Sequence, residues 1–228
     1  MDSTEVTKAQ WDVVYNWAIT NGYYFSSTGP GKVSNHPVNT VNWYDCVKWC
    51  NARSEMDWRT PCYMSGEYVY RGSYVESPSC NTNVNGYHLP SNDEWEYAAR
   101  GGLSSKRFPW GDTVTHNQAN YNSTNSTNST NSTSSYIYDI SSTSGYHPDY
   151  NNGGYPYTSP AGSFAPNGYG LYDIEGNVWE WCNTASGETR GMCGGSWNDN
   201  ASYLRCVHYA WGNPANGYSS TGFRTICR

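Results

Sequence analysis

The sequence predicts an α+β fold with many loops and only a few short helices and strands. Aromatic residues are abundant, with 22 Tyr and 11 Trp among 228 residues, whereas only 14% of the residues are charged. Aromatic side chains bury large areas, so they must supply much of the core. Three segments carry helix-start signals, and Asn-Gly pairs, which mark turns, recur along the chain. Turns and short strands are therefore expected between a few helices.

The first two helices are predicted after Thr7 and after Asn42. Thr7 and Gln10 form a capping box, in which the two residues satisfy backbone N–H groups of one another. The apolar stripe of this helix consists of Trp11, Val14, Tyr15 and Ala18. Asn42 is a favoured N-cap residue for a second helix that runs through about Ser54. Its apolar stripe includes Trp43, Cys46, Val47 and Cys50.

A third helix is predicted to begin at another capping box, formed by Ser91 and Glu94. It runs through Ala98 and stops at Gly101-Gly102, because glycine commonly follows the end of a helix. The rest of the chain predicts turns and short strands. The Asn-Gly turn signals begin at Asn21, Asn85, Asn167 and Asn216.

Residues 122–133 are four copies of Asn-Ser-Thr. The repeat offers no apolar side chain to bury, so it predicts a solvated low-complexity loop over residues 122–135. Each copy is also a formal N-glycosylation sequon, which matters only in a host that glycosylates such sites.

The cysteine count and the charge narrow the setting of the protein. An even number of cysteines favours an oxidising compartment, although buried free thiols are the alternative. The absence of a C-x-x-C motif argues against zinc and thioredoxin-like sites. A net charge of -6 argues against nucleic acid and anionic membranes as partners. The cysteines are Cys46, Cys50, Cys62, Cys80, Cys182, Cys193, Cys206 and Cys227.

A series of motifs extends over nearly the whole chain in a fixed order. It runs through Glu5-Val6-Thr7-x-x-Gln10-Trp11, Pro37-Val38-x-x-Val41-x-Trp43, His88-Leu89-Pro90-Ser91-x-x-Glu94-Trp95-Glu96-Tyr97, Phe108-Pro109-Trp110-Gly111-Asp112, Gly176-Asn177-Val178-Trp179-Glu180-Trp181, Gly194-Gly195-Ser196-Trp197 and Gly222-Phe223-Arg224. In this order the chain resembles the formylglycine-generating-enzyme/sulfatase-modifying-factor family. The resemblance implies one domain, residues 1–228, with a variant of the C-type-lectin fold.

The same resemblance argues against catalysis. Enzymes of this family carry a cysteine pair shortly after the Gly-Gly-Ser-aromatic motif, and the corresponding positions here are Asp199 and Leu204. Neither residue supplies a thiolate nucleophile or a soft copper ligand. The chain is therefore expected not to be an enzyme.

Variable proteins of diversity-generating retroelements form a second group with this fold, and the C-terminal part of the chain looks like theirs. In that group, template adenines are randomised, mostly in Asn codons, so Asn, Asp, Ser, Tyr and His can arise but Trp, Lys and Glu cannot. Gly194-Gly195-Ser196-Trp197 and Gly222-Phe223-Arg224 frame this part of the chain. After Asp199, the only charged residues up to the end of this frame are Arg205 and Arg224. The resemblance implies a diversified ligand-binding region at residues 198–220, with Trp197 and Trp211 as scaffold at its border.

The composition of this region is typical of a binding surface. Tyr and Trp provide rigid contact area, and Ser, Gly and Asn provide adaptable hydrogen bonds. His208 lacks partners for a metal site, so a surface contact is expected, whereas Leu204 and Cys206 are expected to point inward by strand alternation. Tyr203 and Tyr218 are expected to be exposed, with core packing as the alternative. The predicted ligand-binding residues are Asn198, Asp199, Asn200, Ser202, Tyr203, His208, Trp211, Gly212, Asn213, Ala215, Asn216, Gly217, Tyr218 and Ser219.

The resemblance also places a calcium site at the turn that contains Asn177, Val178 and Glu180. Calcium takes six to eight oxygen ligands, and a structural role would follow; hydrogen bonding of Glu180 in the core is the alternative. No cofactor is otherwise required. Cys182 and Cys193 flank a short loop and could face each other across two strands, while related proteins join the regions of Cys50 and Cys227.

These observations favour a monomeric, non-catalytic binding protein for a protein or other macromolecule on a cell or host surface. The resemblance implies export to the cell surface as an outer membrane lipoprotein, with the targeting segment removed. Two rivals belong to other classes. A calcium-dependent sugar lectin needs a carboxylate and amide cluster, of which the region offers Asp199 and several Asn residues. A copper-dependent thiol oxidase needs the cysteine pair that the sequence lacks.

Overall fold

The computed structural model describes residues 1–72, 77–125 and 136–228, and it confirms the α+β, loop-rich class. Helices α1 (Lys8–Thr20), α2 (Trp43–Met56) and α3 (Asn92–Ala99) lie where the capping signals place them. Thr7 and Gln10 form the expected capping box, as do Ser91 and Glu94, and the Asn42 side chain caps α2. The local capping chemistry is therefore sufficient to predict where each helix begins.

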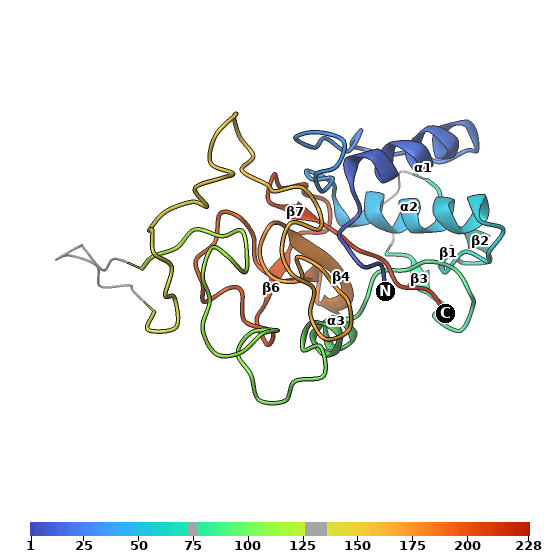
Figure 1. Cartoon of the computed structure of the whole chain (residues 1–228). Helices are drawn as coiled ribbons and strands as arrows, with labels where there is room; N and C mark the ends of the chain where they lie inside the picture. Colours follow the sequence, from blue (N-terminus) through green and yellow to red (C-terminus); the bar gives the residue numbers. More distant parts are fainter. Residues whose placement is uncertain (73–76, 126–135) are drawn as a thin grey trace.

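A four-stranded sheet lies beside the helices (Figure 1). It contains β4 (Trp179–Ser186), β5 (Thr189–Cys193), β6 (Tyr209–Gly212) and β7 (Thr221–Gly222) in the order β6-β5-β4-β7. Neighbouring strands are antiparallel except β4 and β7, which run parallel. A smaller sheet, in the order β2-β1-β3, consists of β1 (Tyr63–Ser65), β2 (Tyr68–Val69) and β3 (Ser79–Cys80).

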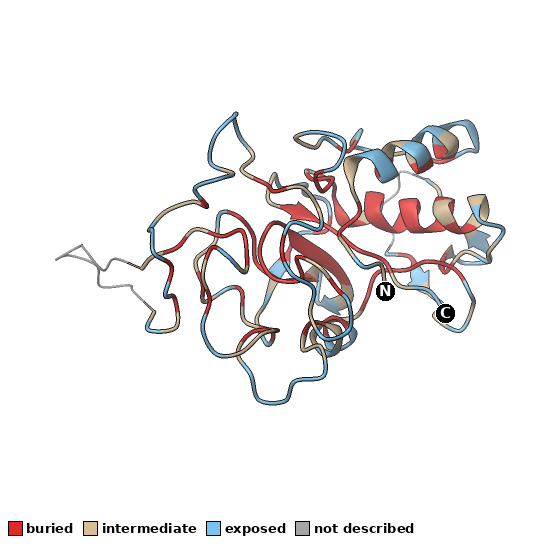
Figure 2. Cartoon of the chain, in the orientation of Figure 1, coloured by how far each residue is buried: buried red, intermediate tan, exposed pale blue. Residues whose placement is uncertain are grey.

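Aromatic rings fill the main core, as the composition predicts. Trp11 of α1 stacks on Trp49 of α2 at 6.2 Å between ring centroids, and Phe223 packs edge-on against Trp49 at 5.2 Å. The indole N–H groups find backbone acceptors: Trp11 Nε1 donates to Thr28 O, and Trp181 Nε1 donates to Val41 O. Figure 2 shows that burial concentrates along α2 and the first half of β4, and β7 and the end of β5 are buried as well. Helices α1 and α2 therefore share one aromatic core with the larger sheet, whereas Trp95 of α3 belongs to a second cluster.

The two ends of the chain lie side by side and close the fold (Figure 1). The Asp2 N–H donates to Thr225 O at 2.8 Å, and the Val6 N–H donates to Phe223 O at 2.9 Å. The segment after β7 is thus held from both sides, by the N-terminal residues and by β4.

The start of the Asn-Ser-Thr repeat corrects one prediction. Ser123 is buried and donates to both carboxylate oxygens of Asp139 at 2.9 Å, while the Asn122 N–H donates to Asp199 O. Hydrogen bonding to a buried carboxylate replaces the apolar contacts that the repeat lacks, so residues 122–125 are not a solvated loop. The rest of the predicted loop, residues 126–135, lies outside the described part of the chain.

Candidate functional site

The frame before the predicted binding region is a tight turn that connects β5 to Trp197. Gly194 and Gly195 adopt φ angles of 94° and 71°, a region that side chains disfavour. A Cβ atom on Gly195 would lie 2.9 Å from Leu204 Cδ1 and 3.1 Å from Tyr203 O. The turn therefore requires glycine, which explains the Gly-Gly pair in the motif.

Both ends of the region are tied to the beginning of β4. The Trp197 N–H donates to Asn177 O at 2.9 Å, and the Trp179 N–H donates to Ser220 O at 2.8 Å. Trp197 is buried, as expected for scaffold. Residues 198–220 are thus a long excursion that leaves and rejoins one place in the fold.

Most of the predicted binding residues have accessible side chains. Asp199, Asn200, Ser202, His208 and Ser219 are half-buried. We call the accessible predicted residues the candidate face. Its exposed members are Asn198, Tyr203, Trp211, Asn213, Ala215, Asn216, Gly217 and Tyr218.

Gly212 was predicted to bind ligand, and this prediction is wrong because Gly212 is buried. A Cβ atom there would lie 2.7 Å from the Trp181 ring and 3.0 Å from Met192 Cε. Gly212 therefore belongs to the scaffold and not to the candidate face. Trp211, predicted both as a contact and as border scaffold, is 41% exposed and so can contact a ligand.

One half of the candidate face surrounds Trp179. The Trp179 Nε1–H donates to Asp199 Oδ2 at 2.8 Å, and Ser196 Oγ donates to the same oxygen. Tyr203 packs edge-on against His208 with centroids 4.9 Å apart, and both contact the Trp179 ring. Burial and, secondarily, the charge of Arg205 lower the pKa of His208, which favours the neutral ring. Asp199 is engaged by internal donors, so this half presents mainly uncharged groups.

Leu204 and Cys206 point inward as predicted, but strand alternation is not the reason. Leu204 and Cys206 are buried, and Arg205 Nε donates to Ser202 O at 2.8 Å. Residues 201–207 form turns and not a strand, however, so alternation along a strand is not the cause. The inward positions arise because Leu204 packs into the cluster with Phe108, and Cys206 packs into the cluster with Trp95.

The other half of the candidate face follows β6 to Tyr218. Tyr209, which the prediction missed, is 48% exposed and packs against Trp211 at 5.4 Å. The following loop is fixed by backbone bonds, since the Thr40 N–H donates to Tyr218 O and the Trp43 N–H donates to Pro214 O. It borders a groove of about 390 Å³ lined by Tyr44, Ser77, Gly187, Glu188, Arg190, Asn213, Pro214 and Ala215.

A segment far away in the sequence, residues 145–157, also reaches the candidate face, and we call it the tyrosine strap. Tyr146 Oη donates to Asn198 Oδ1 at 3.0 Å, and Tyr155 Oη lies 2.8 Å from Ser219 Oγ. Sequence reasoning missed both tyrosines. The strap's Tyr-rich and Asn-Gly-rich composition was the signal that could have suggested a surface like that of residues 198–220.

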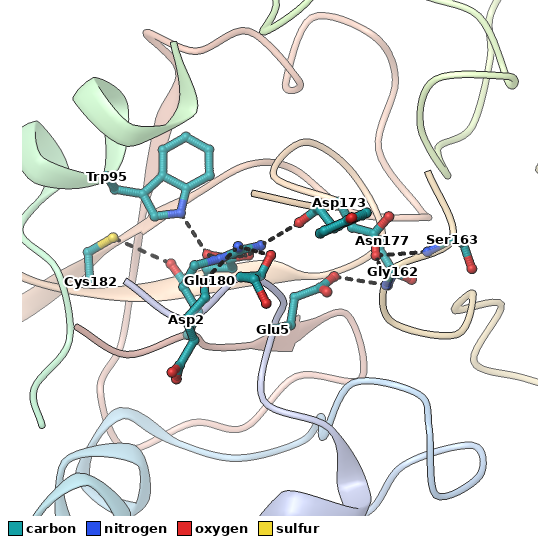
Figure 3. Close-up of polar contacts among 12 residues, drawn as sticks. Asp2, Glu5, Trp95, Gly162, Ser163, Asp173, Asn177, Glu180 and Cys182 are labelled. Atoms are coloured by element: carbon teal, nitrogen blue, oxygen red, sulfur yellow. Dashed lines mark hydrogen bonds and ion pairs between the residues drawn. The ribbon is translucent and has the colours of Figure 1, made fainter. Parts of the chain in front are cut away.

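Among the described residues, the side-chain oxygens at the turn predicted to bind calcium are engaged in hydrogen bonds (Figure 3), and calcium binding there stays a prediction. The Glu180 carboxylate accepts from Arg224 Nε and Nη2 and, at 2.7 Å, from Trp95 Nε1. Asn177 Oδ1 accepts from the Ser159 N–H at 2.9 Å. Oxygens that already accept from N–H donors are poor ligands for a cation that needs six to eight of them. The alternative for Glu180, hydrogen bonding in the core, is confirmed.

The cysteines give no catalytic pair at the expected place. All eight are free thiols in the structure. Cys182 Sγ and Cys193 Sγ lie 3.6 Å apart in the buried space under the sheet, so the predicted pair is in contact. Cys50 is buried in α2 whereas Cys227 is exposed, and their pairing stays a prediction.

Within residues 1–72, 77–125 and 136–228, no group of three His, Cys, Asp or Glu side chains could hold a metal ion.

No helix in the described parts of the chain is long and apolar enough to cross a bilayer. This agrees with the hydropathy of the sequence, in which no segment approaches the roughly 20 apolar residues of a membrane-spanning helix.

Comparison with known proteins supports the family suggested by the motifs. The Sulfatase-modifying factor enzyme 1-like domain matches residues 1–228. The mouse protein named Formylglycine-generating enzyme is 30% identical over 211 residues, which are 84% of this chain and 44% of that protein. The bovine Inactive C-alpha-formylglycine-generating enzyme 2 is 34% identical over 149 residues, covering 61% of this chain and 43% of that protein. The chain thus spans less than half the length of these relatives.

The fold agrees with a solved structure of the same type. The chain superimposes on Treponema denticola variable protein 1 with a TM-score of 0.68 and 27% identity, covering 98% of this chain and 82% of that one. The α+β elements, the Gly-Gly-Ser-Trp turn and the full-length domain match are consistent with the C-type-lectin-like fold that the motifs imply. The family contains both active enzymes and an inactive relative. The chain therefore belongs to the Sulfatase-modifying factor enzyme 1-like family.

Proposed function

We propose that the protein is a non-catalytic ligand-binding protein whose candidate face is diversified by a retroelement. The observation that carries this proposal is the separation of scaffold from surface within residues 198–220. The frame glycines, Trp197 and Gly212 are buried or sterically fixed, whereas Asn198, Tyr203 and most neighbouring predicted residues point outward. Gly217 is the exception on the candidate face, because a Cβ atom there would lie 2.6 Å from Thr40 O. The other side chains of the candidate face can therefore change while the backbone stays the same.

The likeness to a treponemal variable protein supports this function. That protein shares the fold over almost the whole chain. The candidate face is also rich in Asn, Ser and Tyr, the residues that suit a surface with rigid anchors and adaptable hydrogen bonds. The proposed ligand is a protein or other macromolecule on a cell or host surface, bound by a monomer that is displayed as a lipoprotein.

The geometry around Asp199 and Leu204 supports the absence of oxidase activity. Asp199 is held by Ser196 and Trp179, and Leu204 is completely buried. A thiol oxidase of this family needs a cysteine pair there, and a carboxylate and an aliphatic side chain cannot form a disulfide or bind copper as thiolates. Incubation with copper and a cysteine-containing substrate peptide should therefore yield no aldehyde.

Sequencing of the coding region from many cells of the source strain tests the proposal. Substitutions are expected at codons of the candidate face, such as Asn198, Tyr203 and Asn216. Gly212 is the internal control, since it lies between variable positions but must stay constant. The exposed Tyr155 of the strap is an external control of similar accessibility. An invariant region without a nearby template repeat and reverse transcriptase gene would refute the proposal.

A further inference from the structure

Trp197 is covered by side chains of the tyrosine strap. Its ring centroid lies 4.9 Å from that of Tyr155, 5.4 Å from that of Tyr157 and 5.7 Å from that of Tyr146. The Trp197 side chain is 1% exposed, and its Nε1–H has no acceptor among the described residues. A buried N–H without an acceptor is unfavourable, because it has lost its hydrogen bond to water. The tyrosine strap therefore covers the Trp197 ring without satisfying its N–H group.

The strap is joined to the candidate face through side chains. Tyr146 bonds to Asn198 and Tyr155 bonds to Ser219, and both partners are predicted variable residues. Tyr155 nevertheless remains 64% exposed, in contrast to the buried Trp197 beneath it. A tyrosine that served only to cover the indole would be expected to bury more of its ring. Tyr155 contacts Ser219 and Tyr146 contacts Asn198, so one surface includes both segments.

The shared surface carries little charge. The groups it offers are the amide of Asn198, the hydroxyl of Ser219 and the phenol rings of the strap. Within the strap, Asp149 is exposed, and Lys32 Nζ donates to Asn152 O, so the nearby charges are one of each sign. Such a surface complements an uncharged protein surface better than a polyanion, which selects basic faces.

We propose that Tyr155 and the tyrosine strap are a constant part of the ligand-binding surface, with Tyr155 as an anchor for a protein partner. The proposal rests on the proposed function and deepens it. The variable residues would select the partner, while the strap would contribute the same contact area to every complex. Exposed tyrosines at the centre of an interface commonly contribute a large share of the binding energy.

A displayed library tests this inference. The codons for Asn198, Asn200, Ser202, Tyr203, Asn213, Asn216 and Tyr218 would be randomised, with Ser219 and the strap kept. Clones would be selected for binding to hen egg-white lysozyme as the probe. Tyr155→Ala would then be placed in each selected clone. Tyr68→Ala is the matched control, because Tyr68 is 80% exposed on β2, in the other sheet.

Tyr155→Ala is expected to weaken lysozyme binding at least about tenfold in most clones. A tenfold loss corresponds to about 1.4 kcal/mol, and truncation of an anchoring tyrosine typically costs that much or more. Tyr155→Phe should weaken it less, because it keeps the ring and loses only the bond to Ser219. Tyr68→Ala should leave binding unchanged, and equal thermal midpoints would exclude unfolding. Clones that bind equally well with Tyr155→Ala would overturn the inference alone. A library without any lysozyme binders would instead contradict the proposed function, and the inference with it.

Discussion

Arg224 and Glu180 form a buried ion pair in the centre of the fold. Both side chains are at most 1% exposed, and the guanidinium also donates to Tyr172 O. The pair links the segment that follows β7 to β4, the strand to whose beginning both ends of residues 198–220 are tied. A buried pair does not by itself imply extra stability, but removing one partner leaves an uncompensated charge.

Arg224→Met is therefore expected to lower the free energy of unfolding by about 3–5 kcal/mol. Urea unfolding followed by tryptophan fluorescence measures it. The control is Lys106→Met, which removes an exposed ion pair with Asp112 and should cost less than about 1 kcal/mol. Similar losses of unfolding free energy in the two variants would show that burial of the Arg224–Glu180 pair does not make its disruption more costly.

Gly212 tests the boundary between scaffold and candidate face. Gly212→Ala should destabilise the protein by about 1–3 kcal/mol, because its Cβ atom would clash with the Trp181 ring. Gly72→Ala is the control, since none of the described residues lies within 4 Å of a Cβ atom there. If thermal unfolding shows no difference between the variants, Gly212 could vary, and our assignment of it to the scaffold is wrong.

Glu175 should make stability depend on pH. Its side chain is buried, and within the described residues the weakly donating Cys206 thiol is the group that faces its carboxylate. Burial raises the pKa of Glu175 well above its ordinary value of 4.5. The folded state thus holds this proton more tightly than the unfolded state, so the stability it contributes is present below pH 4.5 and is lost as pH rises above it.

Glu175→Gln should remove this loss. The difference in unfolding free energy between Glu175→Gln and the original protein is expected to grow in favour of the variant from pH 5 to pH 8. Denaturant unfolding at several pH values measures that difference, and the variant comparison cancels the opposite contribution of the buried histidines. A difference independent of pH would mean that Glu175 titrates at its ordinary pKa in the folded protein.

At the scale of elements, β4 and β5 bring Cys182 and Cys193 together. Their sulfurs are 3.6 Å apart and both side chains are nearly inaccessible. Burial raises the pKa of the Cys182 thiol, which keeps it protonated and slow to react once folded. Cys193 immediately precedes the frame glycines, so a bond here would hold the strand from which the candidate face begins.

Refolding with oxidised glutathione is expected to join Cys182 and Cys193. The two thiols lose their hydrogens as glutathione disulfide is reduced to two thiols. Mass spectrometry of peptides, with and without reductant, identifies the linked pair, and refolding the Cys182→Ser variant is the control. Linkage of other cysteines, with Cys182 and Cys193 both alkylated as free thiols, would contradict the expectation.

The helices could be predicted from sequence because their signals are local. Capping boxes at Thr7 and Ser91 lie within one turn of the residues they cap. Strands of two or three residues such as β2, β3 and β7 carry no such signal, because two residues are too few to show alternation. Their pairing depends on partners elsewhere in the chain.

At the scale of the whole molecule, the motifs predicted the fold and one part of the candidate face. Residues 198–220 are continuous in sequence, so their composition could be recognised. The tyrosine strap could not be assigned to the same surface, since Tyr155 and Ser219 are 64 positions apart and meet only through tertiary structure. Burial of Gly212 could not be predicted either, because it depends on the position of Trp181 on another strand.

The attachment of both ends of residues 198–220 to Asn177 and Trp179 has a consequence for length as well as for sequence. Extra residues destabilise a loop only slightly when its ends are fixed side by side, since doubling the loop length costs only about 0.6 kcal/mol of closure entropy. Insertions at exposed Asn216 should therefore be tolerated where they keep the backbone bonds of Pro214 to Trp43 and of Tyr218 to Thr40. The fold would then accept binding loops of different sizes, and so ligands of different shapes, without any change in the residues that hold it together.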